Sequence, residues 1–419
     1  MPSDDRKPLL KTIFSGRMFV ALVMGFSCGM PLLLTITVLQ AWMQEEGVDL
    51  TVIGLMALVG LPYTVKFLWA PFLDRYTLPF LGRRRGWLLT AQVALALAIA
   101  GMALTNPGAD PWMVAVAAFL VTFFSASQDI VVDAYRREDL SDEELGLGSS
   151  LYVNGYRLGM LLASGGGLIL ADHIPFTSVY LIMAGCMLPG VLTTLMAPEP
   201  PLPPGVPRSL REAVINPLTE YFSREGALWI LAFILLYKIG DTMASAMTTP
   251  FYLDIGFTKT EIGAVVKLFG FWATVVGSLI GGVIMLRLGI NRSLWIFGVL
   301  QAVSTAGFAL LARAGHSVPM LSGVIAFENL SGGMGTAAYV AFMASITNKR
   351  FTATQYALLS SLMGVPRVIA SAPTGFLAKQ FGWEGFFIAC TLIAAPGMLL
   401  LLKFAPWRPA SPRSGDDDG

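Results

Sequence analysis

The sequence predicts an all-α membrane protein in which twelve hydrophobic helices form two related bundles of six. Of its 419 residues, 55% are hydrophobic and only 13% are charged, whereas a soluble domain carries roughly 25% charged residues. Apolar runs of about 20 residues, long enough to cross a hydrocarbon core of about 30 Å, recur along most of the chain. The third observation is that charged residues recur at matching positions in the two halves of the chain.

The positions of charges, prolines and glycines divide the apolar part of the chain into twelve spans. The first apolar run is too long and too well continued for a cleavable signal, so we interpret it as an uncleaved span. The predicted ranges, with ends accurate to a few residues, are 17–41, 50–73, 87–105, 111–134, 147–171, 176–197, 227–252, 260–286, 293–312, 317–343, 353–378 and 383–404.

The basic residues are distributed very unevenly among the connections. Of the 28 Lys and Arg residues, most lie in the N-terminus, the even-numbered connections or the tail, and only Lys259, Arg313 and Lys379 lie in odd-numbered connections. By the positive-inside rule, both termini are predicted to be cytoplasmic. The formal net charge of +1 leaves no basic surplus to neutralise phosphates, which excludes a nucleic-acid partner.

The longest polar connection divides the chain almost in half and opens with closely spaced prolines, which favour an extended, semi-rigid linker. Beyond them, Leu210, Val214, Leu218 and Phe222 recur at helical spacing. This pattern favours a short surface helix lying on the membrane, with a solvated loop as the alternative. The predicted domains are an N-terminal six-helix bundle (1–198), a cytoplasmic linker (199–226), a C-terminal six-helix bundle (227–406) and a cytoplasmic tail (407–419).

Two loops in equivalent places carry similar charges. Asp74-Arg75 and Gly82 to Arg85 lie between spans 2 and 3, and Gly281-Gly282, Arg287-Leu288-Gly289 and Arg292 lie between spans 8 and 9. Both loops resemble the loop signature of the major facilitator superfamily, which implies a cytoplasmic charge network that stabilises one conformation; a plain charge cluster is the alternative. The first loop has extra residues (76–81), and the second lacks the Asp. The predicted cytoplasmic gate comprises Asp74, Arg75, Arg83, Arg84, Asp133, Arg287 and Arg292.

Nine ionisable residues fall within predicted spans, where each charge facing lipid costs roughly 2.5 kcal/mol or more. Three pairs occupy matching positions in the two halves: Lys66 with Lys267, Asp129 with Glu328 and Arg157 with Arg367. None of the nine lies in spans 3, 6, 9 or 12, the outer spans of the facilitator fold. This distribution predicts a polar central cavity near the interface of the repeats. The nine residues are Lys66, Asp129, Asp133, Arg157, Lys238, Asp241, Lys267, Glu328 and Arg367.

The carboxyl groups in the spans are candidates for proton coupling, because burial favours the protonated form of a carboxyl group. Asp129 is the first candidate, and Asp241 and Glu328 follow. Asp133 shares a helix face with Asp129 but lies beside Arg136 and Arg137 near the cytoplasmic end, which favours a gate role. Lys238 and Asp241, spaced i,i+3, could also simply neutralise each other, as could Glu328 and a basic neighbour.

The cations within the spans favour an anionic or zwitterionic substrate, because Lys and Arg can replace the water around carboxylates. Neutral polar residues on the same spans can bind hydroxyl and amide groups, although each could instead connect two helices. The predicted substrate-binding residues are Lys66, Arg157, Lys238, Lys267, Arg367, Gln40, Gln128, Asn154, Tyr156 and Asn329.

Six stretches through both halves resemble the AmpG-type permeases, the anhydromuropeptide importers of Gram-negative peptidoglycan recycling, which have the major facilitator fold. They are Leu39 to Met43 (LQAWM), Lys66 to Trp87 (KFLWAPFLDRYTLPFLGRRRGW), Ser125 to Ala134 (SASQDIVVDA), Gly155 to Leu161 (GYRLGML), Tyr237 to Thr242 (YKIGDT) and Phe327 to Thr336 (FENLSGGMGT).

The resemblance implies import of N-acetylglucosaminyl-1,6-anhydro-N-acetylmuramic acid and its peptides, driven by the proton gradient, across the inner membrane of a Gram-negative bacterium. In species with an inducible β-lactamase, similar permeases supply the signal that induces the enzyme. The extra residues in the first loop, unusual for the superfamily, are normal for this family.

Two rival functions stay open at this point. The nearer is a proton symporter for another anionic solute, such as a small peptide or a siderophore. A membrane enzyme is disfavoured because the two histidines, His173 and His316, lie in predicted periplasmic connections and form no HExxH pair. We therefore expect a transporter without enzyme activity, metal or cofactor, with protons and a small molecule as its partners in the bilayer, and by analogy of fold a monomer.

Overall fold

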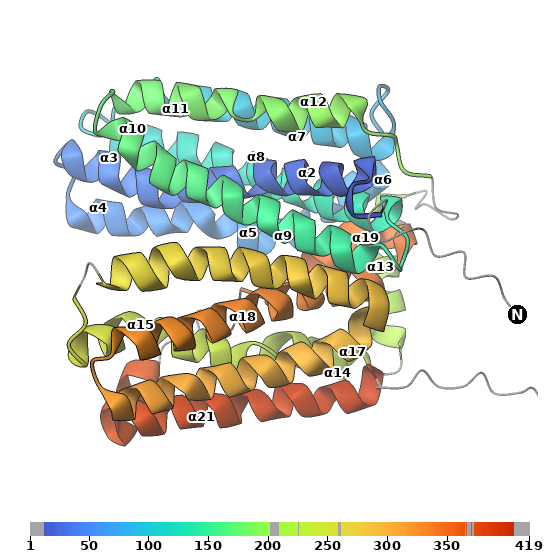
Figure 1. The fold of residues 1–419 in the computed structure, drawn as a ribbon. Coiled ribbons are helices and arrows are strands. Elements are labelled where there is room, and N and C mark those ends of the chain that lie inside the picture. Colours follow the sequence, from blue (N-terminus) through green and yellow to red (C-terminus); the bar gives the residue numbers. More distant parts are fainter. Residues whose placement is uncertain are drawn as a thin grey trace, which may run out of the picture.

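The computed structural model describes residues 12–201, 209–224, 226–258, 261–364, 366, 370 and 373–405. Within these residues the regular structure is entirely helical. Figure 1 shows the N-terminal half, from α2 to α12, above the C-terminal half, from α14 to α21. The two halves run along each other and meet near α6, α13 and α19 at one end of the bundle. We call this end, which holds the 74–86 and 136–144 connections, the basic end.

The N-terminal half contains long helices and helices broken into short pieces. Its elements are α2 (Gly16–Leu33), η1 (Leu34–Val38), α3 (Leu39–Glu45), α4 (Leu50–Leu55), η2 (Met56–Gly60), α5 (Leu61–Val65), η3 (Lys66–Leu68), α6 (Ala70–Arg75), α7 (Arg83–Met102), α8 (Pro111–Asp139), α9 (Leu145–Leu161), η4 (Leu162–Gly166), α10 (Gly167–Ala171), α11 (Phe176–Gly185) and α12 (Leu188–Met196).

The C-terminal half follows a surface helix, α13, whose Ser209 cap accepts a hydrogen bond from the backbone N–H of Glu212 (3.2 Å). The predicted helix after the linker therefore forms. The elements from here on are α13 (Leu210–Ser223), α14 (Ala227–Leu236), α15 (Ile239–Asp254), η5 (Ile262–Phe269), α17 (Gly270–Ala314), α18 (Val318–Ile346), η6 (Lys349–Phe351), α19 (Thr352–Leu362) and α21 (Thr374–Phe404).

Glycines with positive φ turn the chain between spans in equivalent loops of the two halves. Gly289 (φ 76°) divides α17 into two helices, and Gly82 (φ 88°) precedes α7. Glycine adopts this backbone region without the steric penalty that a side chain adds. The two loops singled out by their charges thus also share a backbone feature.

Each of the twelve predicted ranges contains helix within the described residues. In the part of the chain that the structure describes, seven helices are long and apolar enough to cross a membrane, and one of them, Ile262–Ala314, covers most of one predicted range, 260–286, and all of another, 293–312. The range 50–73 is not among the seven because it is broken into short helical pieces, with Pro62 and Pro71 at the starts of two of them. That all twelve ranges cross the membrane stays a prediction.

Small residues allow the first and fifth predicted spans to pack closely. A Cβ atom at Gly25 or Gly29 of α2 would overlap a backbone carbonyl oxygen of α9, and a Cβ atom at Gly155 or Gly159 would overlap one of α2. Such close backbone approach is a common device for packing helices in membranes. The glycine content of these spans is therefore explained by packing.

Replacing Gly29 with Ala should lower the thermal stability of the protein, because the added methyl group would overlap the carbonyl oxygen of Tyr156. Overpacking of this kind costs about 1–3 kcal/mol. The melting temperature in detergent measures the effect. Gly101→Ala is the matched control, since nothing lies within 4 Å of a Cβ atom there; equal melting temperatures for the two variants would contradict the packing argument.

Candidate functional site

Two carboxylates lie buried one turn apart on α8. Asp129 and Asp133 are 6% and 4% exposed. Among the residues that the structure describes, no group hydrogen-bonds to the buried oxygen Oδ1 of Asp129. A buried ionised carboxylate with an unsatisfied oxygen is costly, so this position suits a group that binds a proton.

Lys66 supplies a second positive charge near these carboxylates, besides Arg136, whose Nη2 lies 3.0 Å from Asp133 Oδ1. Lys66 is buried on η3 and interacts electrostatically with both Asp129 and Asp133. Tyr63 and Trp69 hold this broken helix against α8, donating to Ser125 (2.8 Å) and Ser127 (3.0 Å). Lys66 therefore belongs to the carboxylate site. The hydrogen bonds of Tyr63, before it in the sequence, and of Trp69, after it, fix its position against α8.

The neutral polar residues predicted to bind substrate differ in their surroundings. Gln128 is fully buried and donates to the sulfur of Cys28 (3.3 Å), and Asn154 donates to the carbonyl of Ser150 within its own helix. Tyr156 is half-buried on α9, and Gln40 is exposed on α3. The contact made by Gln128 joins α8 to α2, which favours helix-to-helix packing at that position.

A second polar cluster lies within the C-terminal half. Lys238 Nζ lies 3.5 Å from Asp241 Oδ2 and donates to Thr336 Oγ1 (2.7 Å). Glu328 Oε2 accepts a hydrogen bond from the hydroxyl of Ser304 (2.5 Å), and the charges of Asp241 and Lys238 act on Glu328. The cluster thus holds two carboxyl groups close to one lysine.

Arg157 reaches from the N-terminal half toward this cluster. Its Nη1 donates to the carbonyl oxygen of Thr274 (3.3 Å), and its charge acts on Asp241. The hydroxyl of Thr274 in turn donates to Oδ1 of Asn329 (2.7 Å). The structure thus brings Arg157 and Asn329 to Thr274, with Asp241 within electrostatic range.

The remaining two predicted cations are Lys267 and Arg367. Lys267 is exposed on η5, although its counterpart in the other half, Lys66, is buried. Arg367 lies outside the described residues. Lys66 and Lys267 therefore occupy matching positions in the sequence but have different environments in the structure.

A buried charge network occupies the basic end. Arg84 Nη2 contacts Asp74 Oδ1 (2.8 Å) and Glu138 Oε1 (2.7 Å), and its Nε donates to Glu138 Oε2 (3.0 Å). Arg83 Nη2 also donates to Glu138 Oε1 (2.7 Å). All four side chains are at most 6% exposed. Breaking a buried pair of this kind is expensive, since it leaves a charge without compensation.

Asp74 connects this network to the other half. Its Oδ2 accepts hydrogen bonds from the backbone N–H and the hydroxyl of Thr354 (2.8 Å each), and its Oδ1 accepts from the N–H of Ala353 (3.3 Å). These groups form the first turn of α19, where N–H groups lack partners within the helix and a partial positive charge favours a carboxylate. Asp74 therefore caps a helix of the C-terminal half.

Arg136 makes a further bridge between the halves. Its Nη2 donates to Asp133 Oδ1 and to the hydroxyl of Tyr356, both at 3.0 Å, and the guanidinium lies 4.1 Å from the ring centroid of Tyr152. Arg137 donates to the carbonyl oxygen of Ser345 (3.3 Å). Through Asp133 and Arg136 the carboxylates of α8 are connected to the contacts that close the basic end.

The sequence model of the Major Facilitator Superfamily matches the chain twice, over residues 17–312 and over residues 239–418. The chain belongs to this superfamily. It is 46% identical to the anhydromuropeptide permease of Escherichia coli strain K12 over 92% of this chain and 79% of that protein. It is 33% identical to the putative transporter AmpG 4 of Rickettsia conorii, over 92% of this chain and 96% of that one. The predicted membership of the AmpG-type family is thus confirmed.

Solved structures of distant facilitators share the fold. The Escherichia coli fucose:proton symporter superposes with a TM-score of 0.73 at 13% identity, covering 94% of this chain and 98% of its own. The human organic anion transporter MFSD10 gives a TM-score of 0.67 at 15% identity, covering 94% and 100%. The predicted all-α facilitator fold is confirmed, and the transporter is a multi-pass membrane protein for a small molecule.

Two residues predicted for the gate of this facilitator, Arg75 and Arg287, lie outside the buried network around Asp74. Arg75 is half-buried with its guanidinium 5.4 Å from the ring centroid of Tyr76. Arg287 is exposed and Arg292 is half-buried, both at the second charged loop. The loop between spans 8 and 9 lacks the Asp, so it has no counterpart of Asp74 to cap a helix of the other half.

Several residues of the basic end were missed from the sequence. Arg136, three residues after Asp133, was noted as its neighbour but not assigned to the gate, although the i,i+3 spacing could have indicated the pair. Glu138 follows in the same charged run, but its spacing of five residues from Asp133 gives no such signal. Thr354 and Tyr356 carry no such signal, because they lie far from Asp74 and Arg136 in sequence. Glu199 was also missed: its carboxylate accepts from the N–H groups of Arg84 (2.7 Å) and Arg85 (3.0 Å).

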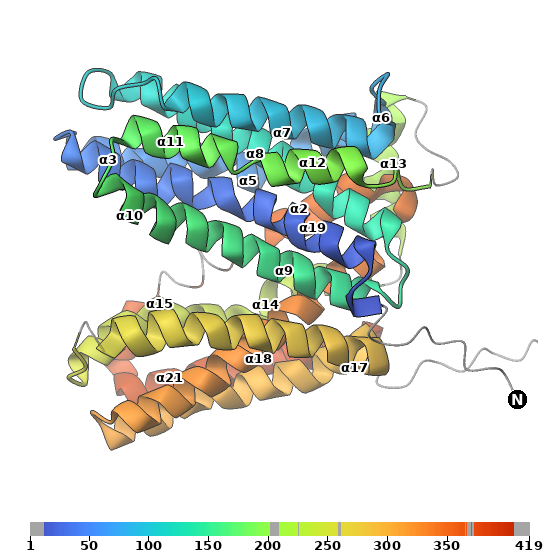
Figure 2. The same cartoon turned by 45° about the horizontal axis from the view of Figure 1, so that its top comes forward.

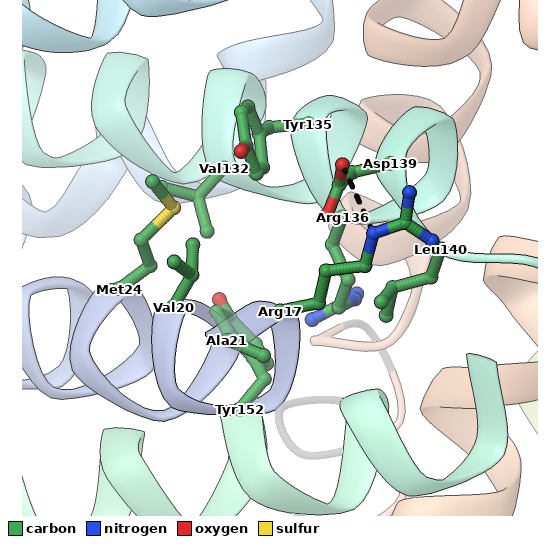
Figure 3. A pocket seen from close by; sticks show the side chains of 10 residues that line it. All are labelled: Arg17, Val20, Ala21, Met24, Val132, Tyr135, Arg136, Asp139, Leu140 and Tyr152. Atoms are coloured by element: carbon green, nitrogen blue, oxygen red, sulfur yellow. Dashed lines mark ion pairs between the residues drawn. The ribbon is translucent and has the colours of Figure 1, made fainter. Parts of the chain in front are cut away.

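Two of the surface hollows are lined by residues other than Asp129, Lys238, Asp241 and Glu328. Figure 3 shows the first, at the basic end, where Arg17 of α2 pairs with Asp139 of α8 (3.8 Å). The second, of about 500 Å³, is lined by apolar residues of 55–61 and by 112–119. It offers no polar group to a polar solute, so the charged clusters remain the better candidates for transport.

Proposed function

We propose that this transporter imports anhydromuropeptides, namely N-acetylglucosaminyl-1,6-anhydro-N-acetylmuramic acid and its peptides, from the periplasm to the cytoplasm in symport with protons. The observation that carries the proposal is the high identity to the anhydromuropeptide permease over nearly the whole chain. The polar clusters support it, since they combine cations for carboxylates with carboxyl groups for protons.

The sidedness of the proposal follows from the distribution of basic residues. We place the transporter in the inner membrane of a Gram-negative bacterium, with the basic end and both termini in the cytoplasm. The bundles 1–198 and 227–406, the linker 199–226 and the tail 407–419 are its proposed domains. Protons, the solute and the bilayer are its partners. It acts as a monomer, without enzyme activity.

The described state is closed at the cytoplasmic end. Asp74 with Thr354 and Arg136 with Tyr356 tie the halves together there, and Ser150 with Ser278 joins them farther along α9 (2.5 Å). Release of the solute to the cytoplasm requires the contacts at the end to break as the halves rock about the bound solute.

Asp129 is the proposed first site of the coupling proton. Protonation would remove the charge from a buried carboxyl group whose Oδ1 lacks a partner among the described residues, and Asp133 and Arg136 lead from it to the gate. The pair of Asp241 and Glu328 is the second candidate, because the two carboxyl groups interact electrostatically and only one lysine, Lys238, pairs with Asp241 among the described residues.

Arg157 is proposed to bind carboxylates of the peptide part of the solute. Replacing Arg157 with Gln should raise the KM of peptide-bearing substrates about tenfold or more, the worth of one charge-assisted hydrogen bond of about 1.5–3 kcal/mol, and change that of the bare disaccharide less. Competition uptake with both substrates measures this. Equal loss for both would remove the carboxylate role of Arg157.

Uptake of radiolabelled anhydromuropeptide into energised vesicles, with and without a protonophore, tests substrate and coupling together. We expect accumulation above the external concentration that the protonophore abolishes. A symporter for another anionic solute, such as a small peptide or siderophore, would ignore the labelled compound, and that result would replace the proposal with this alternative.

A further inference from the structure

The surface helix α13 has three distinct faces. Ala213, Pro217 and Tyr221 are buried on one face. The second face, which we call the exposed stripe, consists of Leu210, Val214, Ile215, Leu218 and Phe222, each 39–51% exposed. At 100° per residue the stripe lies beside the buried face, and Asn216, Thr219 and Ser223 form a polar third face beyond it.

Polar contacts fix the rotation of α13 about its own axis. Gln355 at the start of α19 donates to the carbonyl oxygen of Pro217 (3.1 Å) and to Glu220, and Arg224 donates to the carbonyl oxygen of Ile346 (2.5 Å). Burial alone would raise the pKa of Glu220, but hydrogen bonds from Arg224 and Gln355 outweigh it and keep the pKa below its ordinary value. The exposed stripe therefore cannot turn inward while these contacts hold.

The depth of α13 follows from the chain length that separates it from the next span. Ser223 ends α13, and Ala227 begins the candidate span Ala227–Asp254. Four residues reach at most about 14 Å, so the last turn of α13 lies near the level where the bilayer begins. Trp229, half exposed with Lys403 Nζ 4.7 Å from its ring centroid, marks that level, since Trp and Lys are typical of membrane interfaces.

We propose that the exposed stripe of α13 docks on the phospholipid surface of the leaflet at the basic end. The stripe lies between the face that packs on the protein and the face that meets water, which is the geometry of a helix lying in the plane of an interface. Arg211 is exposed within the same sector, between Leu218 and Phe222 on the helical wheel, where it can reach lipid phosphates.

This docking connects the lipid surface to the gate. The residue that holds α13, Gln355, directly precedes Tyr356, which accepts the hydrogen bond from Arg136. Figure 2 shows α13 crossing the end of the bundle beside α6. The lipid contact thereby steadies the first turns of α19 in the closed state.

Single cysteines at Leu218 and Phe222 test the docking, with Thr219→Cys and Ser223→Cys as matched controls on the polar face. The background is Cys186→Ala, because Cys28 and Cys390 are buried, and the background protein should take up no label. Each variant is labelled with an environment-sensitive NBD probe and reconstituted into vesicles of phosphatidylethanolamine and phosphatidylglycerol that contain lipids with a nitroxide near the headgroup.

We expect the nitroxide lipids to quench the probes at positions 218 and 222 at least twofold more than those at 219 and 223, with aqueous iodide showing the opposite order. Equal quenching at all four positions would overturn the proposal. So would probes at 218 and 222 that are shielded from both quenchers and transfer energy between labelled copies, because a second copy would then cover the stripe. Neither of these two results would contradict the proposed uptake of anhydromuropeptides, which is tested by a separate experiment.

Discussion

Replacing Asp129 with Asn should abolish proton-driven accumulation of the solute while the protein stays folded and inserted. Asn has nearly the same shape but cannot take up a proton, so the step that couples the gradient to gate movement is lost. Accumulation should fall from above the external concentration to no more than equilibrium with it. Uptake into energised vesicles measures this loss.

Counterflow separates coupling from binding in this variant. Exchange of external for internal solute needs no net proton movement, so Asp129→Asn should retain it. Asp241→Asn is the informative comparison, because Asp241 belongs to the second carboxyl cluster. Normal accumulation by Asp129→Asn together with its loss in Asp241→Asn would move the proposed proton site to the C-terminal half.

Replacing Asp74 with Asn should open the basic end and reduce transport about 100-fold. The carboxylate compensates Arg84 and accepts three hydrogen bonds from the start of α19, and Asn brings no charge and one acceptor oxygen. Breaking a buried pair costs about 3–5 kcal/mol. If most of this cost falls on the closed state, the ratio of closed to open molecules falls by about 100-fold or more, because each 1.4 kcal/mol changes an equilibrium constant about tenfold.

The position of the gate can be measured directly. Spin labels at Tyr76 and Lys349, which are exposed beside α6 and α19, should report longer distances in Asp74→Asn than in the unsubstituted protein. Arg75→Gln is the matched control, because Arg75 lies next to Asp74 in sequence but outside the buried network. An unchanged distance distribution in Asp74→Asn would show that the helix cap does not hold the gate.

Much of the fold could be predicted from the sequence, because lipid constrains both length and composition of a span. The apolar ranges each contain helix within the described residues, and the predicted helix at Leu210 to Phe222 corresponds to α13. The range 50–73 shows the limit: its hydropathy predicted one span, whereas the chain forms short α and 3-10 pieces that place Lys66 beside Asp129.

The candidate site could be predicted in part. Charges within spans must face polar partners, which singled out Asp129, Lys238, Asp241 and Glu328 before any contact was known. Lys267 shows that equivalence between halves does not extend to environment, since it is exposed while Lys66 is buried. The role of a charge depends on its neighbours in space, which a repeat in sequence does not specify.

The sequence by itself determined that this chain lies in a membrane, where its helices fall, which residues carry charge at depth and which family it belongs to. Only the tertiary structure decided that Asp74 caps α19, that Arg136 lies between Asp133 and Tyr356, and that the basic end is closed. The physical reason is range: hydropathy acts locally along the chain, whereas hydrogen bonds between the halves join residues that only packing brings together.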